Sequence, residues 1–274
     1  MVDPPPVHAL SEVDNWRAPH VAAAVVRPGQ PPIFRGDTDR PFALASLTKM
    51  LVAFGALVAH EEGSLSLDDP AGPPGATIRH LLAHASGLSP DTDKALAPPA
   101  SRRIYSNRGF EVIGAALEHA TDMSISDYVV DAVALRASAI KGSPASGGVG
   151  TVRDLASFAA ELVAPTRVTT ATLDAATTVS FPGLAGVLPG FGRQTPNDWG
   201  LGFEIRASKD PHWTGARNSP QTYGHFGQSG TMMWVDPTAG LALICLTDRP
   251  FGDWARRAWP ALSDAVLAES SGDS

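Results

Sequence analysis

A serine and a lysine three residues apart are the first candidates for chemistry in this chain. Ser46-Leu-Thr-Lys49 opens the apolar run SLTKMLVAFGALVAHEE, which stops at Gly63. Residues three apart share one face of a helix, so the hydroxyl and the amine can meet. Apolar surroundings disfavour a charged amine, lower its pKa and let it accept the serine proton. The spacing alone leaves open the alternative of a lysine that reaches from the helix to water.

Two further segments could carry protons or bind substrate. Tyr105-Ser-Asn107 follows the arginines of SRRIYSN, and neighbouring cations lower the pKa of a phenol below its reference value of roughly 10. His225-Phe-Gly227-Gln228 lies at the edge of a predicted C-terminal meander, where a glycine permits close approach to the strand. The plainer interpretations are Asn107 as a helix N-cap with Tyr105 on the surface, and an ordinary hairpin with a half-exposed histidine.

Hydrophobic periodicity predicts the elements that position these residues. The N-terminal part reads as a β-hairpin, the middle as mostly helical, and the part after Pro189 as an antiparallel meander followed by a helix. The predicted strands are His20–Arg27, Pro32–Phe34, Trp199–Arg206, Gly230–Val235 and Leu241–Thr247, and the predicted helices are Ser46–Glu62, Thr77–Ala85, Phe110–Ala120, Ser126–Leu135, a helix capped by Thr151 and stopped by Pro165, and Asp253–Leu267, interrupted at Pro260.

This order predicts a mixed α/β (α+β) fold in which strands from both ends of the chain build one antiparallel sheet, flanked by helices. The sheet-containing domain would comprise residues 1–45 and 195–274. A mainly helical domain, residues 46–194, would be inserted between them, with the active site at the junction.

Composition excludes several classes of protein. The chain has 274 residues, of which 43% are hydrophobic and 18% charged, so disorder is not its main state. A net charge of −7 without a basic block makes nucleic acid and anionic membranes poor partners. Cys245 lies alone in an apolar run and is expected to be a buried thiol.

The N-terminus lacks the features of a signal peptide, and the apolar stretch Met50–Ala59 is too short to span a membrane, so we expect a soluble, cytoplasmic protein.

The segments SLTK, YSN and HFG occur in this order on a buried helix, a loop and a strand edge. Together with LSLDDP, IRHLLAHASGL, YSNRGFEVIGAALE and GHFGQSGTMMWVDPTAGLAL, they make the chain resemble the serine β-lactamase and penicillin-binding-protein-like superfamily from Ala22 to Leu267. The resemblance is to the branch of class C β-lactamases, D,D-carboxypeptidases and esterases, whose motifs are SxxK, YxN and KTG or HxG.

The resemblance implies a role for each matching position. Ser46 would be the acylated nucleophile, Lys49 its proton acceptor and Tyr105 a proton shuttle. Asn107 would contact the substrate carbonyl side and fix Lys49, and His225 would replace the KTG lysine. The backbone N–H groups of Ser46 and Gln228 would form the oxyanion hole, with Gly227 and Gln228 counted among the substrate-binding residues. The substrate would be a small-molecule or peptide acyl compound, and no cofactor or metal is implied.

Departures from the family pattern shape the expected substrate. The segment between Leu88 and Tyr105 is short, which indicates trimmed loops and an open cleft, with loops 89–104, 136–150 and 182–198 as its walls. An open cleft favours ester or peptide hydrolysis over true β-lactamase activity. A histidine with an ordinary pKa near 6.5 predicts that hydrolysis of a carboxylate-bearing substrate weakens as the pH rises through neutrality.

Other functions find less support in the sequence. His80 and His84 have the spacing of two zinc ligands on a helix, but HLLAH lacks the glutamate of HExxH, so hydrogen bonding of the helix and the following turn is the preferred interpretation. No GxSxG motif occurs, and Gly148-Val-Gly150 lacks a dinucleotide-binding context. The alternative to a serine hydrolase is a catalytically silent protein of this fold that binds peptide or peptidoglycan-like ligands. The oligomeric state is not readable from the sequence.

Overall fold

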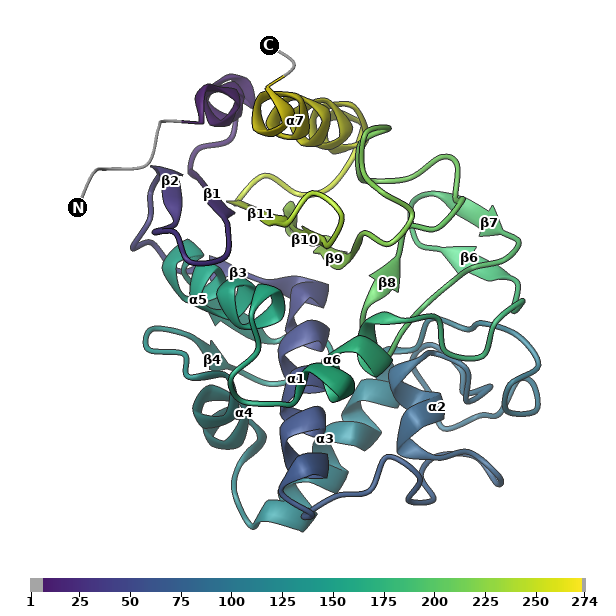
Figure 1. Cartoon of the computed structure of the whole chain (residues 1–274). Helices are drawn as coiled ribbons and strands as arrows, with labels where there is room; N and C mark the ends of the chain where they lie inside the picture. Colours follow the sequence, from purple (N-terminus) through teal and green to yellow (C-terminus); the bar gives the residue numbers. More distant parts are fainter. Residues whose placement is uncertain (1–6, 273–274) are drawn as a thin grey trace.

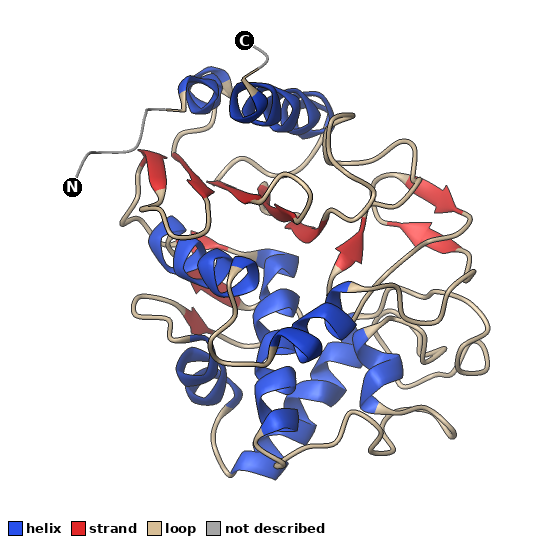
Figure 2. Ribbon diagram, in the orientation of Figure 1, coloured by secondary structure: helices blue, strands red, loops and turns tan. Residues whose placement is uncertain are grey.

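The computed structural model describes residues 7–272, in which a six-stranded antiparallel sheet separates two groups of helices (Figures 1 and 2). The strand order is β2-β1-β11-β10-β9-β8. Both ends of the chain therefore build the same sheet, as predicted. The strands are β1 (Val21–Val26), β2 (Ile33–Gly36), β8 (Glu204–Ile205), β9 (Tyr223–Gly227), β10 (Thr231–Asp236) and β11 (Leu241–Thr247).

Strand β1 shows how the sheet holds two hydrophobic cores. Its residues pair with β11 from Val21 opposite Thr247 to Val26 opposite Ala242. Alternate side chains point to opposite faces of a strand. Ala23 and Val25 accordingly join one core with the 3₁₀-helix η1 (His8–Asn15) and helix α7 (Asp253–Ser271), which lie above the sheet in Figure 1. Their neighbours along β1 join the other core, on the side where α5 packs against β1 and β11.

Helices fill the layer below the sheet. Helix α1 runs through its centre and is buried from Thr48 to Ala59, in agreement with its apolar sequence. Helix α5 begins with Thr151, whose side chain accepts a hydrogen bond from the Asp154 N–H as predicted for a cap. The helices here are α1 (Thr48–Glu61), α2 (Ile78–Leu82), α3 (Asn107–Thr121), α4 (Ile125–Val133), α5 (Val152–Val163) and α6 (Thr170–Thr177).

Several predicted boundaries were wrong. The strand expected over Trp199–Arg206 is reduced to β8, because the backbone N–H groups of Leu201 and Gly202 donate to Ala176 and Leu82 in the helical layer instead of to a neighbouring strand. Helix α7 continues through Pro260 without a break. Helix α6 was not anticipated, nor were the short strands β3 (Phe42–Ala43), β4 (Ala139–Ile140), β5 (Gly148–Gly150), β6 (Gly186–Leu188) and β7 (Gly192–Gln194).

Candidate active site

Ser46 lies where the chain passes from the sheet to the helical layer. It belongs to the 3₁₀ turn η2 (Ala45–Leu47), two residues before α1 begins, and not to α1 itself as the sequence had suggested. Ala45 adopts a left-handed backbone with φ 47°. The Thr48 hydroxyl fastens this turn by donating to the Ala45 carbonyl oxygen at 2.6 Å and accepting from the Gly148 N–H at 2.8 Å. The serine is therefore presented by a constrained turn at the mouth of a buried helix.

Strand β9 approaches the Ser46 turn at Gly227. A β-carbon at this position would lie 2.4 Å from the Leu44 carbonyl oxygen and 2.5 Å from the Thr231 hydroxyl. Only glycine allows the strand this close approach. Strand β9 pairs with β10 along its length but with β8 only at Tyr223 and Gly224. Within residues 7–272 the other side of His225–Gly227 has no strand partner, so the HFG segment lies at an open strand edge, as the sequence predicted.

Lys49 is fully buried one helical turn after Ser46. Its Nζ lies 3.3 Å from the Ser46 Oγ, and it donates to the Asn107 Oδ1 and to the Ala145 carbonyl oxygen, both at 2.8 Å. Burial lowers the pKa of Lys49 to about 7, although the negative charge of Asp91 opposes this shift. Lys49 can thus be an uncharged base near neutral pH.

Tyr105 donates its phenolic hydrogen to the Ser46 Oγ at 2.8 Å. Its ring packs beside His84, at 4.5 Å between centroids, and beside Trp199, at 5.8 Å, so it is not the surface tyrosine of the plainer interpretation. Burial raises the pKa of the phenol well above its ordinary value, and the hydrogen bond to Ser46 only partly opposes this. The prediction of an easily ionised Tyr105 was wrong, because desolvation outweighs nearby cations.

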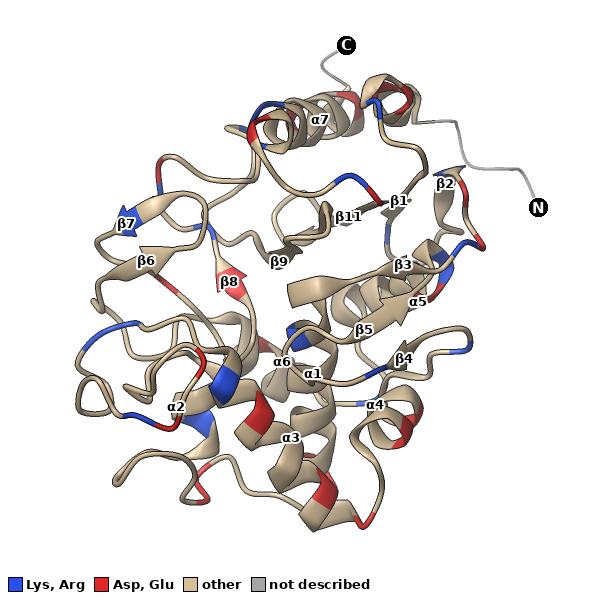
Figure 3. Ribbon diagram, turned by 180° about the vertical axis from the view of Figure 1, so that it is seen from behind, with Lys and Arg blue, Asp and Glu red and all other residues tan. Residues whose placement is uncertain are grey.

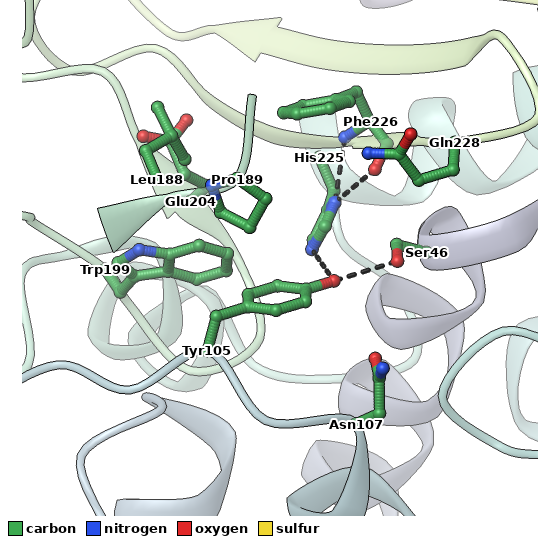
Figure 4. A pocket seen from close by; sticks show the side chains of 10 residues that line it. All are labelled: Ser46, Tyr105, Asn107, Leu188, Pro189, Trp199, Glu204, His225, Phe226 and Gln228. Atoms are coloured by element: carbon green, nitrogen blue, oxygen red, sulfur yellow. Dashed lines mark hydrogen bonds between the residues drawn. The ribbon is translucent and has the colours of Figure 1, made fainter. Parts of the chain in front are cut away.

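His225 on β9 turns its Nε2 toward the Tyr105 hydroxyl at 3.4 Å, while its Nδ1 lies within 2.8 Å of the Phe226 backbone N–H and 2.7 Å of the Phe226 carbonyl oxygen (Figure 4). It is only 4% exposed. Burial, with the adjacent Lys49, lowers the pKa of His225 to about 3. The predicted loss of a histidine charge through neutrality was therefore wrong: His225 is already neutral at pH 6.

Comparison with known proteins identifies the family of this chain. The family model described as beta-lactamase matches residues 11–137 and 130–267. The chain belongs to the β-lactamase family. It is 54% identical to a β-lactamase of known structure from Mycobacterium bovis, which it matches with a TM-score of 0.93 over 96% of this chain and 99% of that one.

More distant relatives are similar in part of the sequence or in fold. A Salmonella paratyphi B protein provisionally named as a D-alanyl-D-alanine carboxypeptidase is 42% identical over 64 residues, which are 22% of this chain and 15% of that protein. The simvastatin synthase LovD from Aspergillus terreus, as a mutant, shares the fold with a TM-score of 0.78, 16% identity, and coverage of 96% of this chain and 97% of that one. This chain therefore has the β-lactamase fold, and a short part of its sequence is similar to a carboxypeptidase-like protein.

In this β-lactamase-family chain the candidate residues meet in one cavity of about 240 Å³ (Figure 4). Five predicted residues from three separate segments of the chain line it: Ser46, Tyr105, Asn107, His225 and Gln228. The predicted residues Lys49 and Gly227 are not among the lining residues. Sequence reasoning did not assign the remaining lining residues, which are Leu188, Pro189, Trp199, Glu204 and Phe226. Among the large aromatic residues of the C-terminal half, Trp199 lines this cavity, whereas Phe191, Tyr223 and Trp234 do not.

Glu204 is the least expected member of the cavity lining. It is 1% exposed, and its carboxylate accepts hydrogen bonds from Lys209, from His212 at 2.9 Å and from the Trp213 indole at 3.0 Å. Burial raises the pKa of such a carboxyl, but His212 and Lys209 outweigh it and hold the pKa at about 2. Glu204 is thus a satisfied, ionised group, and the sequence offered no spacing that joined it to the site.

His84 holds the Tyr105 segment in place. Its backbone carbonyl oxygen accepts from the Ile104 N–H at 2.9 Å, and its Nδ1 accepts from the Ser106 N–H at 3.1 Å. His80 instead stacks on Phe181 and bonds to the Thr77 hydroxyl. Among residues 7–272, no group of three or more His, Cys, Asp or Glu side chains is arranged to hold a metal ion. No helix in that range has the length and apolar character needed to cross a membrane.

Proposed function

We propose that the chain is a serine hydrolase that cleaves an ester or amide through a covalent acyl-enzyme on Ser46. The observation that carries the proposal is the environment of the Ser46 Oγ, which has a buried amine at 3.3 Å and a protonated phenol at 2.8 Å. A serine hydroxyl is a weak nucleophile unless a base removes its proton. Here both a base and a proton donor lie within reach of the same oxygen.

Acylation follows from these distances. Neutral Lys49 takes the hydroxyl proton as the Ser46 Oγ attacks the substrate carbonyl, which forms a carbon–oxygen bond and moves the carbonyl electrons to an oxyanion. Collapse of this intermediate breaks the bond to the leaving group, which takes a proton from the Tyr105 hydroxyl. The Lys49 ammonium, 4.8 Å from the Tyr105 ring centre, stabilises the phenolate and then restores its proton.

The oxyanion requires hydrogen-bond donors. We assign the backbone N–H groups of Ser46 and Gln228, since both residues line the cavity. Loss of one such donor typically costs about 2.7–4 kcal/mol of transition-state stabilisation. In the second half-reaction, water attacks the acyl carbonyl and gives a proton to Lys49. The bond between the acyl carbon and the Ser46 Oγ then breaks, and the Oγ takes this proton back from the Lys49 ammonium.

The charges in the cavity favour esters over small anionic substrates such as β-lactams. None of its lining residues is a lysine or an arginine, and His225, which stands where many family members have a lysine, is neutral. Glu204 adds a buried carboxylate, which pairs with Lys209 and also binds His212 and the Trp213 indole. A carboxylate held close to the scissile bond would therefore find no cation among the lining residues.

Parallel assays test the proposal. Short p-nitrophenyl esters, a chromogenic cephalosporin and a D-alanyl-D-alanine peptide are offered to the wild type, to Ser46→Ala and to Ser157→Ala, which removes an exposed hydroxyl on α5. We expect ester hydrolysis by the wild type and Ser157→Ala, none by Ser46→Ala, and a mass adduct of a serine-reactive phosphonate on Ser46. A chain that only binds ligands would form no adduct, and binding by Ser46→Ala would remain unchanged.

A further inference from the structure

A second hollow of about 670 Å³ adjoins the Ser46 cavity. The two share Tyr105 and Pro189 as lining residues, so they meet at the residue that donates to the nucleophile. We call this hollow the outer groove. One of its walls is formed by the segment before Tyr105, which includes Leu96 and Arg102. The other wall is formed by the β6–β7 hairpin, which includes Val187 and Arg193. A substrate bound to Ser46 can therefore extend into the groove.

The floor of the groove is rigid. Arg103 and Gly186 form a parallel bridge, in which the Arg103 N–H donates to the Ala185 carbonyl oxygen at 2.9 Å. A β-carbon on Gly186 would lie 2.5 Å from the Arg103 carbonyl oxygen. The two walls of the groove therefore come into contact only because this residue is a glycine. The Arg103 guanidinium points into the protein and donates to four backbone carbonyl oxygens, of Ala83, Ser180, Phe181 and Asn197.

The walls of the groove are apolar and exposed. Val187 is 59% exposed and Leu96 is 42% exposed; among residues 7–272 only Met123 is a further large hydrophobic side chain of this kind. Two of these three residues therefore line one groove, which adjoins the cavity of the proposed nucleophile. Clustered exposed apolar side chains of this sort mark a binding surface more often than chance exposure does.

The same groove carries two exposed guanidinium groups. Register places Arg193 directly opposite Val187 in the β6–β7 hairpin, and Figure 3 shows the basic segment of β7 at the edge of the molecule. Arg193 has no ion-pair partner among the described residues, and the one hydrogen bond of Arg102 goes to the Leu96 carbonyl oxygen at 3.0 Å. The nearby carboxylates are engaged, since Asp91 accepts from Asn107 and Asp93 from Arg108.

We infer that the outer groove binds the acyl part of the substrate, and that this part is an apolar chain ending in a carboxylate. The inference rests on the proposed hydrolase function. The apolar walls would cover the methylene groups, while Arg102 and Arg193 would pair with the terminal anion. This arrangement accounts for a cavity without its own cation: the anion of the substrate is recognised one groove away from the scissile bond.

Two p-nitrophenyl esters of equal chain length test the inference: the octanoate and the mono-ester of octanedioic acid. Arg193→Gln should lower kcat/KM for the carboxylate ester about threefold, and Arg102→Gln with Arg193→Gln about tenfold, as expected for partly exposed ion pairs. In the same variants, kcat/KM for the octanoate and for the short acetate should change less than twofold. Arg257→Gln, which removes an exposed charge on α7, is the matched control and should leave all three esters unchanged.

The apolar wall has its own test. Val187→Ser should lower kcat/KM for the octanoate about threefold relative to the acetate, because part of the chain loses its apolar cover. Raising the ionic strength from about 0.05 M to about 0.5 M should reduce the effect of Arg193→Gln on the carboxylate ester.

The inference is overturned if the arginine variants lower kcat/KM equally for the octanoate and the carboxylate ester. It is also overturned if Arg257→Gln has the same effect on kcat/KM as Arg193→Gln. This outcome is distinct from failure of the proposed function. If no ester is cleaved and Ser46 takes no label, the hydrolase proposal fails; if Ser46 is labelled and the acetate is cleaved while the ratio of the two long esters is unaffected, only the groove assignment fails.

Discussion

The Lys49 Nζ lies 2.8 Å from the Asn107 Oδ1, although 58 residues separate them in the chain. The orientation of the Asn107 amide is fixed by its other end, because the Nδ2 donates to the Asp91 carboxylate at 2.9 Å. Asn107 Oδ1 and the Ala145 carbonyl oxygen can only accept, so they use two N–H bonds of Lys49. In an uncharged amine the remaining position is a lone pair, and it faces the Ser46 hydroxyl.

This arrangement gives the first prediction, a pH profile. The kcat/KM for a neutral ester should rise about tenfold per pH unit below pH 7 and level off above it, because Lys49 with a pKa of about 7 must be uncharged to accept the serine proton. His225, with a pKa of about 3, should add no step between pH 6 and 8. Initial rates with p-nitrophenyl acetate, corrected for spontaneous hydrolysis, measure the profile; a rate that falls as the pH rises from 6 to 8 would contradict it.

Asp91 provides a variant that shifts this profile. Its charge raises the pKa of Lys49, so Asp91→Asn should lower that pKa and move the rising limb to lower pH. Asp69→Asn, at an exposed acid elsewhere on the surface, is the matched control and should leave the midpoint unchanged. A midpoint that moves to higher pH in Asp91→Asn would show that the titrating base is not Lys49.

Tyr105→Phe tests the proton donor. The variant keeps the ring that packs beside His84 and Trp199 but loses the hydroxyl 2.8 Å from the Ser46 Oγ. We expect kcat to fall about 10²- to 10⁴-fold for an alkyl ester, whose leaving group needs a proton, and less for a p-nitrophenyl ester. Both substrates are assayed at the same pH, with the melting temperature as a control for folding. An equal loss of kcat on the alkyl ester and the p-nitrophenyl ester would argue against proton donation by Tyr105.

The sequence brought together most of the candidate residues that meet in the cavity because each of their segments has a local signal. The helix after Ser46 is apolar on nearly every face, and the YSN and HFG segments sit at recognisable boundaries, so their order and resemblance identified the residues that meet in the cavity. The sheet from both chain ends was likewise readable, since β1 and β11 are continuous apolar runs. These features depend on residues close together in sequence.

Features that depend on burial by distant segments could not be predicted in this way. The pKa of Tyr105 moved opposite to the sequence-based expectation, and the pKa of His225 moved well below the ordinary value that was expected, because such expectations ignore desolvation by residues far along the chain. Glu204 was missed for the same reason: its partners Lys209 and His212 lie in an irregular loop, where no periodicity signals that the carboxylate is buried.

Gly227 offers a test of the close approach between β9 and the Ser46 turn. Gly227→Ala would place a methyl group 2.4 Å from the Leu44 carbonyl oxygen, so the strand or the turn must move. We expect a loss of about 1–3 kcal/mol in the free energy of unfolding and a lower kcat. In Gly252→Ala, the control, the nearest atom to the new carbon is 3.9 Å away. Denaturant unfolding and ester hydrolysis are measured for both variants, and full activity in Gly227→Ala would show that this approach does not position Ser46.

The buried Glu204 network gives the last prediction. Glu204→Gln removes the charge that compensates Lys209, which is 3% exposed, and should lower the free energy of unfolding by about 3–5 kcal/mol at pH 7. In Glu204→Gln with Lys209→Met, no uncompensated lysine remains, so part of this loss should be recovered. Arg256→Gln, which breaks an exposed pair with Asp253, should cost less than about 1 kcal/mol.

The pH dependence of this loss has a defined sign. Because the folded state lowers the pKa of Glu204 from 4.5 to about 2, its stabilisation is complete above the unfolded value and is lost as the pH falls toward 2. The difference in stability between wild type and Glu204→Gln should therefore be constant from pH 5 to 7 and should narrow below about pH 4.5. Urea unfolding across this range measures it; a difference that widens on acidification would mean that Glu204 is protonated, and not ionised, in the folded protein.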